Sequence, residues 1–392
     1  MPGSLPARRL LLKHAVEQFD ALAAESNDNP VLQDELARAY FNSARLPDML
    51  LAEKDATLKK GIAIYQRLNI QDPANIRYQE QLALGEIALG DITKMRGSVS
   101  GALLLHRAGV ARLEQIVKDE PNDHAHRINL SYAYLDTATI YILKGDIEAA
   151  SQTTRKASAA TEKLRNADFA DSDLNQIGDQ ARIQIAVEET LAGNHKSAIV
   201  KLRRILAEYK IKGAETPNDT RINYYLWAIN RRLAEALEKD GNICEAAEHL
   251  QTALSIIESL LAESPKDFGY HRNSGITNIF FGQMLVLQKQ PARAIPHFRR
   301  ALDLSNRVLE IDPDHSEAKT DRARANANLG RALILTGKNS EGIEYLNKAE
   351  IMFGQSCQLD NENAQLTKDY AQTVDWLKSA LKQSGWLAVA LN

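Results

Sequence analysis

The sequence predicts an all-α fold built from stacked helix pairs, and three observations support this prediction. Strong helix-forming residues dominate the chain, whereas Gly (20) and Pro (11) are few among its 392 residues. Alternating β-branched runs bounded by turn residues, which indicate strands, do not occur. Prolines, glycines and small residues recur at a fixed interval of 48 residues. An interval in the range of about 20–50 residues is typical of repeat architectures.

The interval is carried by four sets of equivalent positions. Prolines stand at Pro73, Pro121, Pro217, Pro265 and Pro313, and Phe169 and Asn361 fill the two remaining places. Glycines stand at Gly97, Gly145, Gly193, Gly241 and Gly337, with Lys289 in the one gap. Two further sets hold only small residues, namely Gly90, Ala138, Ala186, Ala234, Gly282 and Gly330, and Ala102, Ala150, Ala198, Ala246, Ala294 and Gly342. Four sets that keep one register indicate a repeated structural unit.

Residues 122–169 illustrate how one unit folds. Pro121 and the following Asn-Asp pair form a helix-start signal, and a first helix follows with one apolar face at three-and-four spacing. Gly145 ends that helix, because glycine accepts the left-handed conformation of a helix terminus. A second helix of about 20–24 residues starts near Ile147, at a rise of about 1.5 Å per residue. The small positions are expected where the two helices cross at about 8–10 Å.

The elements follow in order along the chain. Residues 1–25 are expected to form a single N-terminal helix. Seven repeats occupy 26–361, with bounds 26–73, 74–121, 122–169, 170–217, 218–265, 266–313 and 314–361. Residues 362–392 are expected to form the closing helix that covers the apolar end of a solenoid.

The pattern of small residues resembles that of the tetratricopeptide repeat. This repeat is a helix–turn–helix of about 34 residues with the pattern W-x2-L-G-x2-Y, then A-x3-F, then P. The resemblance lies at Leu89-Gly90, Phe281-Gly282, Leu329-Gly330, Ala138 with Tyr141, and Ala294 with Phe298. It implies a right-handed superhelical solenoid of about seven helix pairs, whose first helices line a concave face. The tryptophan position of the family instead holds Glu86, Tyr134, Arg182, Asn230, Asn278 and Asn326, so ring packing there must differ. Each unit is longer than the family's, and we assign the extra length equally to both helices.

Composition excludes several classes of function. Lys plus Arg (48) nearly balances Asp plus Glu (51), whereas a general nucleic-acid binder carries a basic excess. The sequence contains no run of about 18 apolar residues, so it predicts no membrane-spanning helix. His124 and His126 would point apart on a helix, and His249 and His297 belong to different units, so we expect no metal site. We also expect no cofactor and no catalytic centre, because no acid, base or nucleophile clusters in the sequence.

The predicted function is therefore non-enzymatic protein binding. The family resemblance implies a groove for a peptide or protein with an apolar or amphipathic segment. Partner contacts are expected from Tyr132, Leu135, Thr139, Ile142, Ile183, Val187, Arg231, Glu235, Ile276 and Ile279. Long helices bury more than one stripe, so an alternative is that several of these residues belong to the core. A second candidate surface is a basic ridge of Arg155-Lys156, Arg203-Arg204 and Arg299-Arg300 on the second helices.

The N-terminus carries a second resemblance. Pro2-Gly3-Ser4, Pro6-Ala7-Arg8, Leu10-Leu11 and Asp20-Ala21-Leu22-Ala23 resemble the start of the helical-repeat region that follows the kinase domain in bacterial serine/threonine kinases. This resemblance implies an alternative function as the sensory or regulatory part of such a signalling protein. We expect a cytoplasmic location, or an extracytoplasmic one if the chain is the detached C-terminal region of a membrane kinase.

Overall fold

The computed structural model describes residues 4–25, 29–46, 49–165 and 172–383. Within these ranges the chain forms helices joined by short turns, without a strand. The chain divides into two compact units, Met1–Ile142 with Glu148–Gly178, and Leu143–Ile147 with Asp179–Asn392. Of the helices in the described ranges, none is long and apolar enough to cross a lipid bilayer. The all-α repeat fold predicted from the sequence is confirmed.

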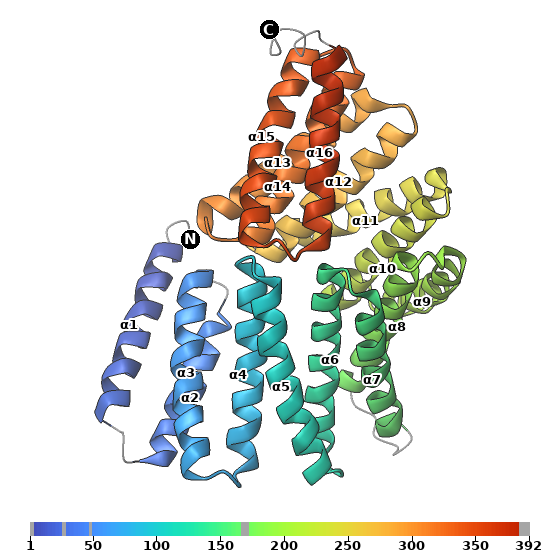
Figure 1. The fold of residues 1–392 in the computed structure, drawn as a ribbon. Coiled ribbons are helices and arrows are strands. Elements are labelled where there is room, and N and C mark those ends of the chain that lie inside the picture. Colours follow the sequence, from blue (N-terminus) through green and yellow to red (C-terminus); the bar gives the residue numbers. More distant parts are fainter. Residues whose placement is uncertain (1–3, 26–28, 47–48, 166–171, 384–392) are drawn as a thin grey trace. The chain divides into compact units, whose positions relative to one another are not determined.

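The helices of the first unit occur as consecutive pairs after one leading helix. They are α1 (Ser4–Glu25), α2 (Pro30–Ala44) with α3 (Leu51–Gln71), α4 (Ile76–Met95) with α5 (Val99–Asp119), and α6 (His124–Lys144) with α7 (Ile147–Arg165). Figure 1 shows α4 and α5 side by side, and they are among the most extensively packed pairs. The predicted leading helix is present from Ser4, while residues 1–3 lie outside the described ranges.

The second unit continues the same alternation. Its helices are α8 (Ser172–Leu191), which begins in the first unit, α9 (His195–Glu215), α10 (Thr220–Lys239), α11 (Ile243–Glu263), α12 (Phe268–Leu287), α13 (Pro291–Ile311), α14 (Ser316–Leu335), α15 (Asn339–Leu359) and α16 (Ala364–Gln383). Six of the seven second helices have 21 residues and α7 has 19. The expected closing helix is α16, and its predicted extension over 384–392 lies outside the described ranges. The division into a leading helix, seven repeats and a closing helix stays a proposal.

The turns inside six helix pairs, from α4–α5 to α14–α15, contain a left-handed residue, as the glycine positions predict. Gly97, Gly145, Gly193, Gly241 and Gly337 have φ between 83° and 90°. Lys289, which fills the gap in this series, is the one non-glycine residue with positive φ in the described chain (φ 62°). The following residue closes the turn, for example by Gln290 N–H donating to the carbonyl of Leu285 (2.8 Å).

The turn between pairs is fixed by a side-chain cap. At α4, α6, α10, α12, α14 and α16, the residue two places after the proline position lies at the start of the helix and accepts a hydrogen bond from a backbone N–H group of the first turn. Asp219 accepts from Arg221 and Ile222, and Asp267 accepts from Tyr270. Such caps satisfy helix N–H groups that have no partner within the helix.

Small residues allow the two helices of a pair to cross closely. A Cβ added at Gly330 would lie 2.7 Å from the carbonyl oxygen of Gly342, and one at Gly282 would lie 2.5 Å from the ring of Phe298. Ala102, Ala150, Ala198, Ala246 and Ala294 are all fully buried. The core of each unit therefore lies between first and second helices, as the two small-residue series indicate.

The tryptophan position of the family is polar here and is satisfied within each pair. Glu86 accepts from Arg112 Nε (3.1 Å), Arg182 donates to Glu208, and Tyr134 donates to Glu114. His249 and His297 bond to Asn230 (2.8 Å) and Asn278 (3.0 Å). These contacts explain why the ring packing differs. They also tie both histidines to separate repeats, as expected.

Candidate partner-binding face

Neighbouring first helices contact each other in a fixed register. Hydrogen bonds between them join residues 45 to 50 positions apart, such as Glu80 with Asn129, Trp227 with Thr277, and Gln283 with Asn328. This offset follows from the 48-residue repeat, since equivalent residues of parallel helices lie nearly opposite each other. The side chains that this register places beside one another on first helices, and that reach solvent, are called the first-helix face. Each of the two units has its own first-helix face. In the first unit it includes Asp91, Tyr132, Asp136, Thr139 and Ile142, and in the second unit it includes Ile183, Arg231, Glu235, Ile276, Gln283 and Arg331.

The structure places the predicted contact residues on α6, α8, α10 and α12, with different degrees of exposure. Thr139 is exposed, and Tyr132, Ile142, Ile183, Arg231, Glu235 and Ile276 are half-buried. Leu135, Val187 and Ile279 are only 6%, 8% and 4% exposed. Ile279 packs against Ala301 and Ala325 in the core. These three residues therefore serve packing, because a long first helix buries apolar side chains toward its own partner helix.

Arg231 and Glu235 form a buried ion pair on α10. Arg231 Nη1 donates to Glu235, and the guanidinium lies 5.6 Å from the ring of Trp227 and 5.8 Å from the ring of Phe280. Burial, together with the charge of Arg232, lowers the pKa of Arg231 to about 10. Burial alone would raise the pKa of Glu235, but the charges of Arg231 and Arg232 lower it. The Arg231 guanidinium thus lies near two aromatic rings and is paired with Glu235 on the same helix.

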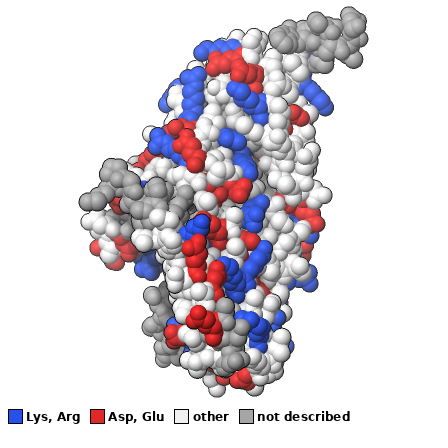
Figure 2. Space-filling model, turned by 90° about the vertical axis from the view of Figure 1, so that its left-hand side faces the viewer, with Lys and Arg blue, Asp and Glu red and all other residues white. Residues whose placement is uncertain are grey.

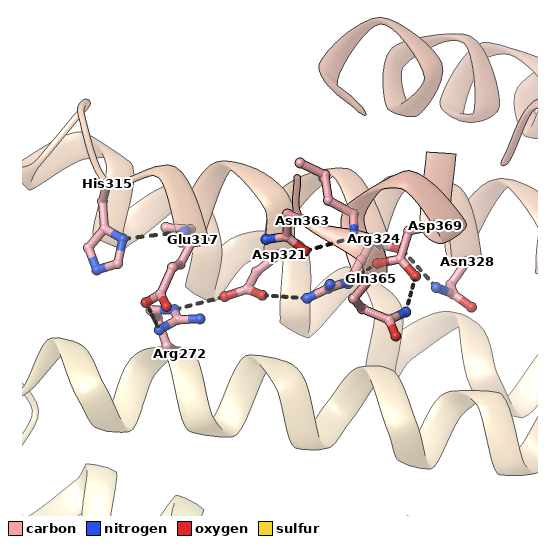
Figure 3. Close-up of polar contacts among 11 residues, drawn as sticks. Arg272, His315, Glu317, Asp321, Arg324, Asn328, Asn363, Gln365 and Asp369 are labelled. Atoms are coloured by element: carbon pink, nitrogen blue, oxygen red, sulfur yellow. Dashed lines mark hydrogen bonds and ion pairs between the residues drawn. The ribbon is translucent and has the colours of Figure 1, made fainter. Parts of the chain in front are cut away.

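A chain of ion pairs connects α12, α14 and α16 of the second unit (Figure 3). Arg272 on α12 donates to Glu317 (2.5 Å) and Asp321 (2.8 Å) on α14. Arg324 on α14 donates to Asp321 (3.5 Å) and to Asp369 (2.5 Å) on α16. Burial alone would lower the pKa of Arg272, but the charges of Asp321 and Glu317 raise it. These ion pairs were not predicted from the sequence, because the pairs between helices join residues that are 45 to 49 positions apart.

The basic ridge on the second helices is neutralised by acids of neighbouring second helices. Lys156 contacts Glu114 (3.0 Å), Arg203 contacts Glu245 (2.5 Å), and Arg299 contacts Glu341 (3.5 Å). Each pair spans 42 residues, which is again set by the repeat. Figure 2 shows basic and acidic side chains interspersed over the face that it presents. A ridge paired in this way favours surface stabilisation over recognition of an acidic partner.

One group of metal-ligand residue types converges among the described residues. Glu120, Asp123 and His126 offer ligand atoms within 4.8 Å of one another at the turn between α5 and α6. Both nitrogens of His126 are already engaged, with Glu80 (2.7 Å) and Glu120 (3.0 Å). Burial alone would lower the pKa of His126, but Glu80, Glu120 and Asp123 raise it. The three residues could hold a divalent cation, but an imidazolium among carboxylates accounts for their geometry.

Comparison with known proteins supports the repeat fold. Residues 323–350, which span parts of α14 and α15, match the family model described as "Tetratricopeptide repeat". The structure is similar to "Rap Protein Complexed with Competence and Sporulation Factor", with a TM-score of 0.50, 13% identity, and coverage of 97% of this chain and 98% of that chain. It is also similar to the "Rap conjugation gene regulator of the plasmid pLS20 in complex with the Phr* peptide", with a TM-score of 0.51, 14% identity, and coverage of 95% and 96%. No curated protein matches the chain. These structures share the all-α repeat fold of the chain, and the match over residues 323–350 agrees with the tetratricopeptide resemblance of its small-residue pattern.

Proposed function

We propose that this tetratricopeptide-like repeat protein is a non-enzymatic scaffold that binds a peptide or protein along its first-helix face. The observation that carries the proposal is the side-chain register between neighbouring first helices. Contacts such as Glu80 with Asn129 (3.0 Å) in the first unit and Gln283 with Asn328 (3.1 Å) in the second hold adjacent helices together, so the exposed side chains within each unit would form a preformed surface. A preformed surface loses little conformational entropy on binding. Each of the two similar Rap structures is named as a complex, one with a factor and one with a peptide, which agrees with this use of the fold.

The partner is expected to be amphipathic. In the first unit, Tyr132 and Ile142 retain apolar surface and Thr139 offers a polar contact. In the second unit, Ile183 and Ile276 retain apolar surface and the Arg231–Glu235 pair offers polar contacts. Leu135, Val187 and Ile279 are buried. Of the two surfaces considered from sequence, the ion-paired second-helix ridge is the weaker candidate, because a partner would have to displace its existing contacts.

A matched pair of threonine variants tests the proposal. Thr139 on α6 and Thr252 on α11 are both exposed, and each hydroxyl donates to the carbonyl four residues earlier (3.2 and 3.1 Å). Thr139→Arg places a bulky cation on the first-helix face, whereas Thr252→Arg makes the same change on a second helix. We expect wild type and Thr252→Arg to select the same peptides from a randomised twelve-residue library, and Thr139→Arg to bind them at least about tenfold more weakly. Circular dichroism must show the same helix content for both variants.

Two results would contradict the proposal. Equal binding by both variants would place the recognition surface elsewhere. No selected peptide with any form of the protein would refute peptide recognition by the first-helix face. The alternative function, a regulatory region of a bacterial serine/threonine kinase, rests on the N-terminal resemblance alone.

A further inference from the structure

His106 occupies a position that packing alone does not explain. It lies on α5 and is fully buried (0%). The equivalent positions of the other repeats, 48 residues apart, hold Thr154, Leu202, Leu250, Phe298 and Leu346, all of them buried. Gly90 makes room for the imidazole, since a Cβ there would lie 2.3 Å from His106 Cδ2. Leucine fits beside glycine at the equivalent crossing of Gly330 and Leu346, so the fold does not require a histidine.

The ring of His106 is also incompletely satisfied. Its Nδ1 lies 3.5 Å from the hydroxyl of Thr137, but its Nε2 is buried and has no hydrogen-bond partner among the described residues. Nε2 lies 3.6 Å from Oδ1 of Asp91 on α4, the first helix of the same pair, so it points toward that carboxylate. An unsatisfied buried polar group costs about 1–3 kcal/mol, which leucine at this position would avoid. The retained imidazole therefore points to a role beyond packing.

Two carboxylates stand beside this ring on the first-helix face. Asp91 on α4 is balanced by Lys94 (3.2 Å). Asp136 on α6 makes no hydrogen bond or ion pair with the described residues and is exposed to solvent. Burial, followed by the negative charge of Asp91, raises the pKa of Asp136 to about 6.

We propose that Asp91 and Asp136 form a subsite for one cationic side chain, lysine or arginine, of the bound partner, with buried His106 as the positioning residue. This inference rests on the proposed function and adds the chemistry of one contact. Lys94 already pairs with Asp91 and also acts on Asp136 through its charge, but Asp136 makes no ion pair with the described residues, so a partner cation would give it one. The buried ring of His106, with Nε2 3.6 Å from Asp91 Oδ1, would restrict the position of the Asp91 carboxylate. Among the described residues, the side chains that converge as candidate metal ligands are Glu120, Asp123 and His126. A metal ion is therefore not the expected occupant of the Asp91–Asp136 subsite.

The direct test uses a small probe, so that it does not depend on an identified partner. Full-length protein labelled with ¹³C at aspartate Cγ is titrated with N-acetyl-arginine-N-methylamide and followed by carboxyl-detected NMR. We expect saturable shifts of the Asp91 and Asp136 resonances, and binding at least about tenfold weaker in Asp136→Asn. Asp375→Asn, which removes an exposed carboxylate on α16, should leave the affinity unchanged. An Asp136 resonance that moves no more than that of Asp375 would overturn the proposal.

The role of His106 is tested by His106→Leu, which copies the residue of other repeats. We expect weaker binding of the probe by about threefold to tenfold, together with unchanged or higher thermal stability, because an unsatisfied polar group leaves the core. A purely structural histidine would give the opposite pattern, a lower stability with unchanged binding. Unchanged binding in a folded His106→Leu variant would therefore refute its positioning role.

Failure of this inference can be told apart from failure of the proposed function. If library peptides bind in a Thr139-dependent manner but show no lysine or arginine preference, and the probe leaves Asp136 unmoved, the cation subsite is wrong and the scaffold function stands. If the probe shifts Asp136 but no peptide is selected, the cation subsite stands and the peptide-binding function is wrong.

Discussion

At the scale of single residues, the repeat positions specify backbone conformation. Five of the six turns inside helix pairs for which a positive φ is recorded use glycine, and the sixth uses Lys289 with φ 62°. An L-residue in the left-handed region loses about 1–2 kcal/mol relative to ordinary conformations, because its Cβ approaches the neighbouring carbonyl. The lysine therefore marks a position where the local sequence opposes the local structure.

We predict that Lys289→Gly raises the free energy of unfolding by about 1 kcal/mol. Chemical denaturation followed by circular dichroism would show the gain as a higher midpoint. The reciprocal change Gly241→Lys, at an open turn with φ 88° and no atom within 4 Å of a built Cβ, should lower the midpoint by a similar amount. An unchanged midpoint in both variants would contradict a strained backbone at Lys289.

Asp136 makes stability depend on pH in a defined direction. In the folded protein burial and the charge of Asp91 raise the pKa of Asp136 from its ordinary value of 3.8 to about 6, so the folded protein binds more protons than the unfolded chain between these values. Stability contributed by the protonated form is therefore lost as the pH rises from about 4 to about 6. Asp136→Asn should have a higher denaturation midpoint than wild type at pH 7 and nearly the same midpoint at pH 4. A constant difference between the two proteins across this range would show that ionisation of Asp136 is not responsible.

At the scale of helix pairs, close approach determines which glycines are replaceable. Gly330→Ala would place a Cβ 2.7 Å from the Gly342 carbonyl oxygen and 3.0 Å from Leu346 N, and backbone atoms cannot move aside cheaply. We predict a loss of about 1–3 kcal/mol. Gly354 in α15 is a matched control, because its built Cβ has Tyr370 Oη at 3.8 Å as its nearest contact. Gly354→Ala should stabilise the helix by about 0.5–1 kcal/mol, and thermal melts of both variants would check the opposite signs.

The ion-pair chain between first helices gives a second prediction at this scale. Asp321 is 4% exposed and contacts both Arg272 and Arg324. Asp321→Ala should lower the free energy of unfolding by about 2–3 kcal/mol. This loss lies in the lower part of the range for removing one member of a buried ion pair, because each guanidinium keeps a second carboxylate. Asp303 also contacts two arginines, Arg300 (3.5 Å) and Arg307 (3.2 Å), but its side chain is 50% exposed. Asp303→Ala should therefore change the midpoint of urea unfolding very little, and equal losses would contradict a special role for the buried chain.

At the scale of the whole molecule, a stack of repeats requires a covered end. α16 places Leu366 and Tyr370 against Phe353, and Trp376 and Ala380 against Leu346. Arg331 also lies over the ring of Trp376 at 4.6 Å. A chain that ends at residue 361 should expose this apolar surface, lower the melting temperature and increase binding of a hydrophobic dye. Trp376→Ala, which removes one ring and keeps the helix, should have a smaller effect of the same sign.

The sequence by itself determined the repeat length, the helix class, the turn glycines and the small residues at helix crossings. These features are local or recur at one fixed interval, so a pattern of residue types is sufficient to predict them. The predicted contact residues were only partly informative, since Leu135, Val187 and Ile279 share the periodicity of the first-helix face but are buried. Periodicity gives the direction of a side chain, whereas burial depends on how deeply two long helices pack.

Only the tertiary structure decided which polar residues meet. Arg272 with Asp321, and Asp91 with Asp136 and His106, come from different helices that are separated by tens of residues. One signal for the second group was present in the sequence, since His106 stands where other repeats have Thr154, Leu202, Leu250, Phe298 and Leu346. Its meaning required the structure, because hydrogen bonding and the electrostatic environment depend on distances of a few ångströms that repeat spacing alone does not determine.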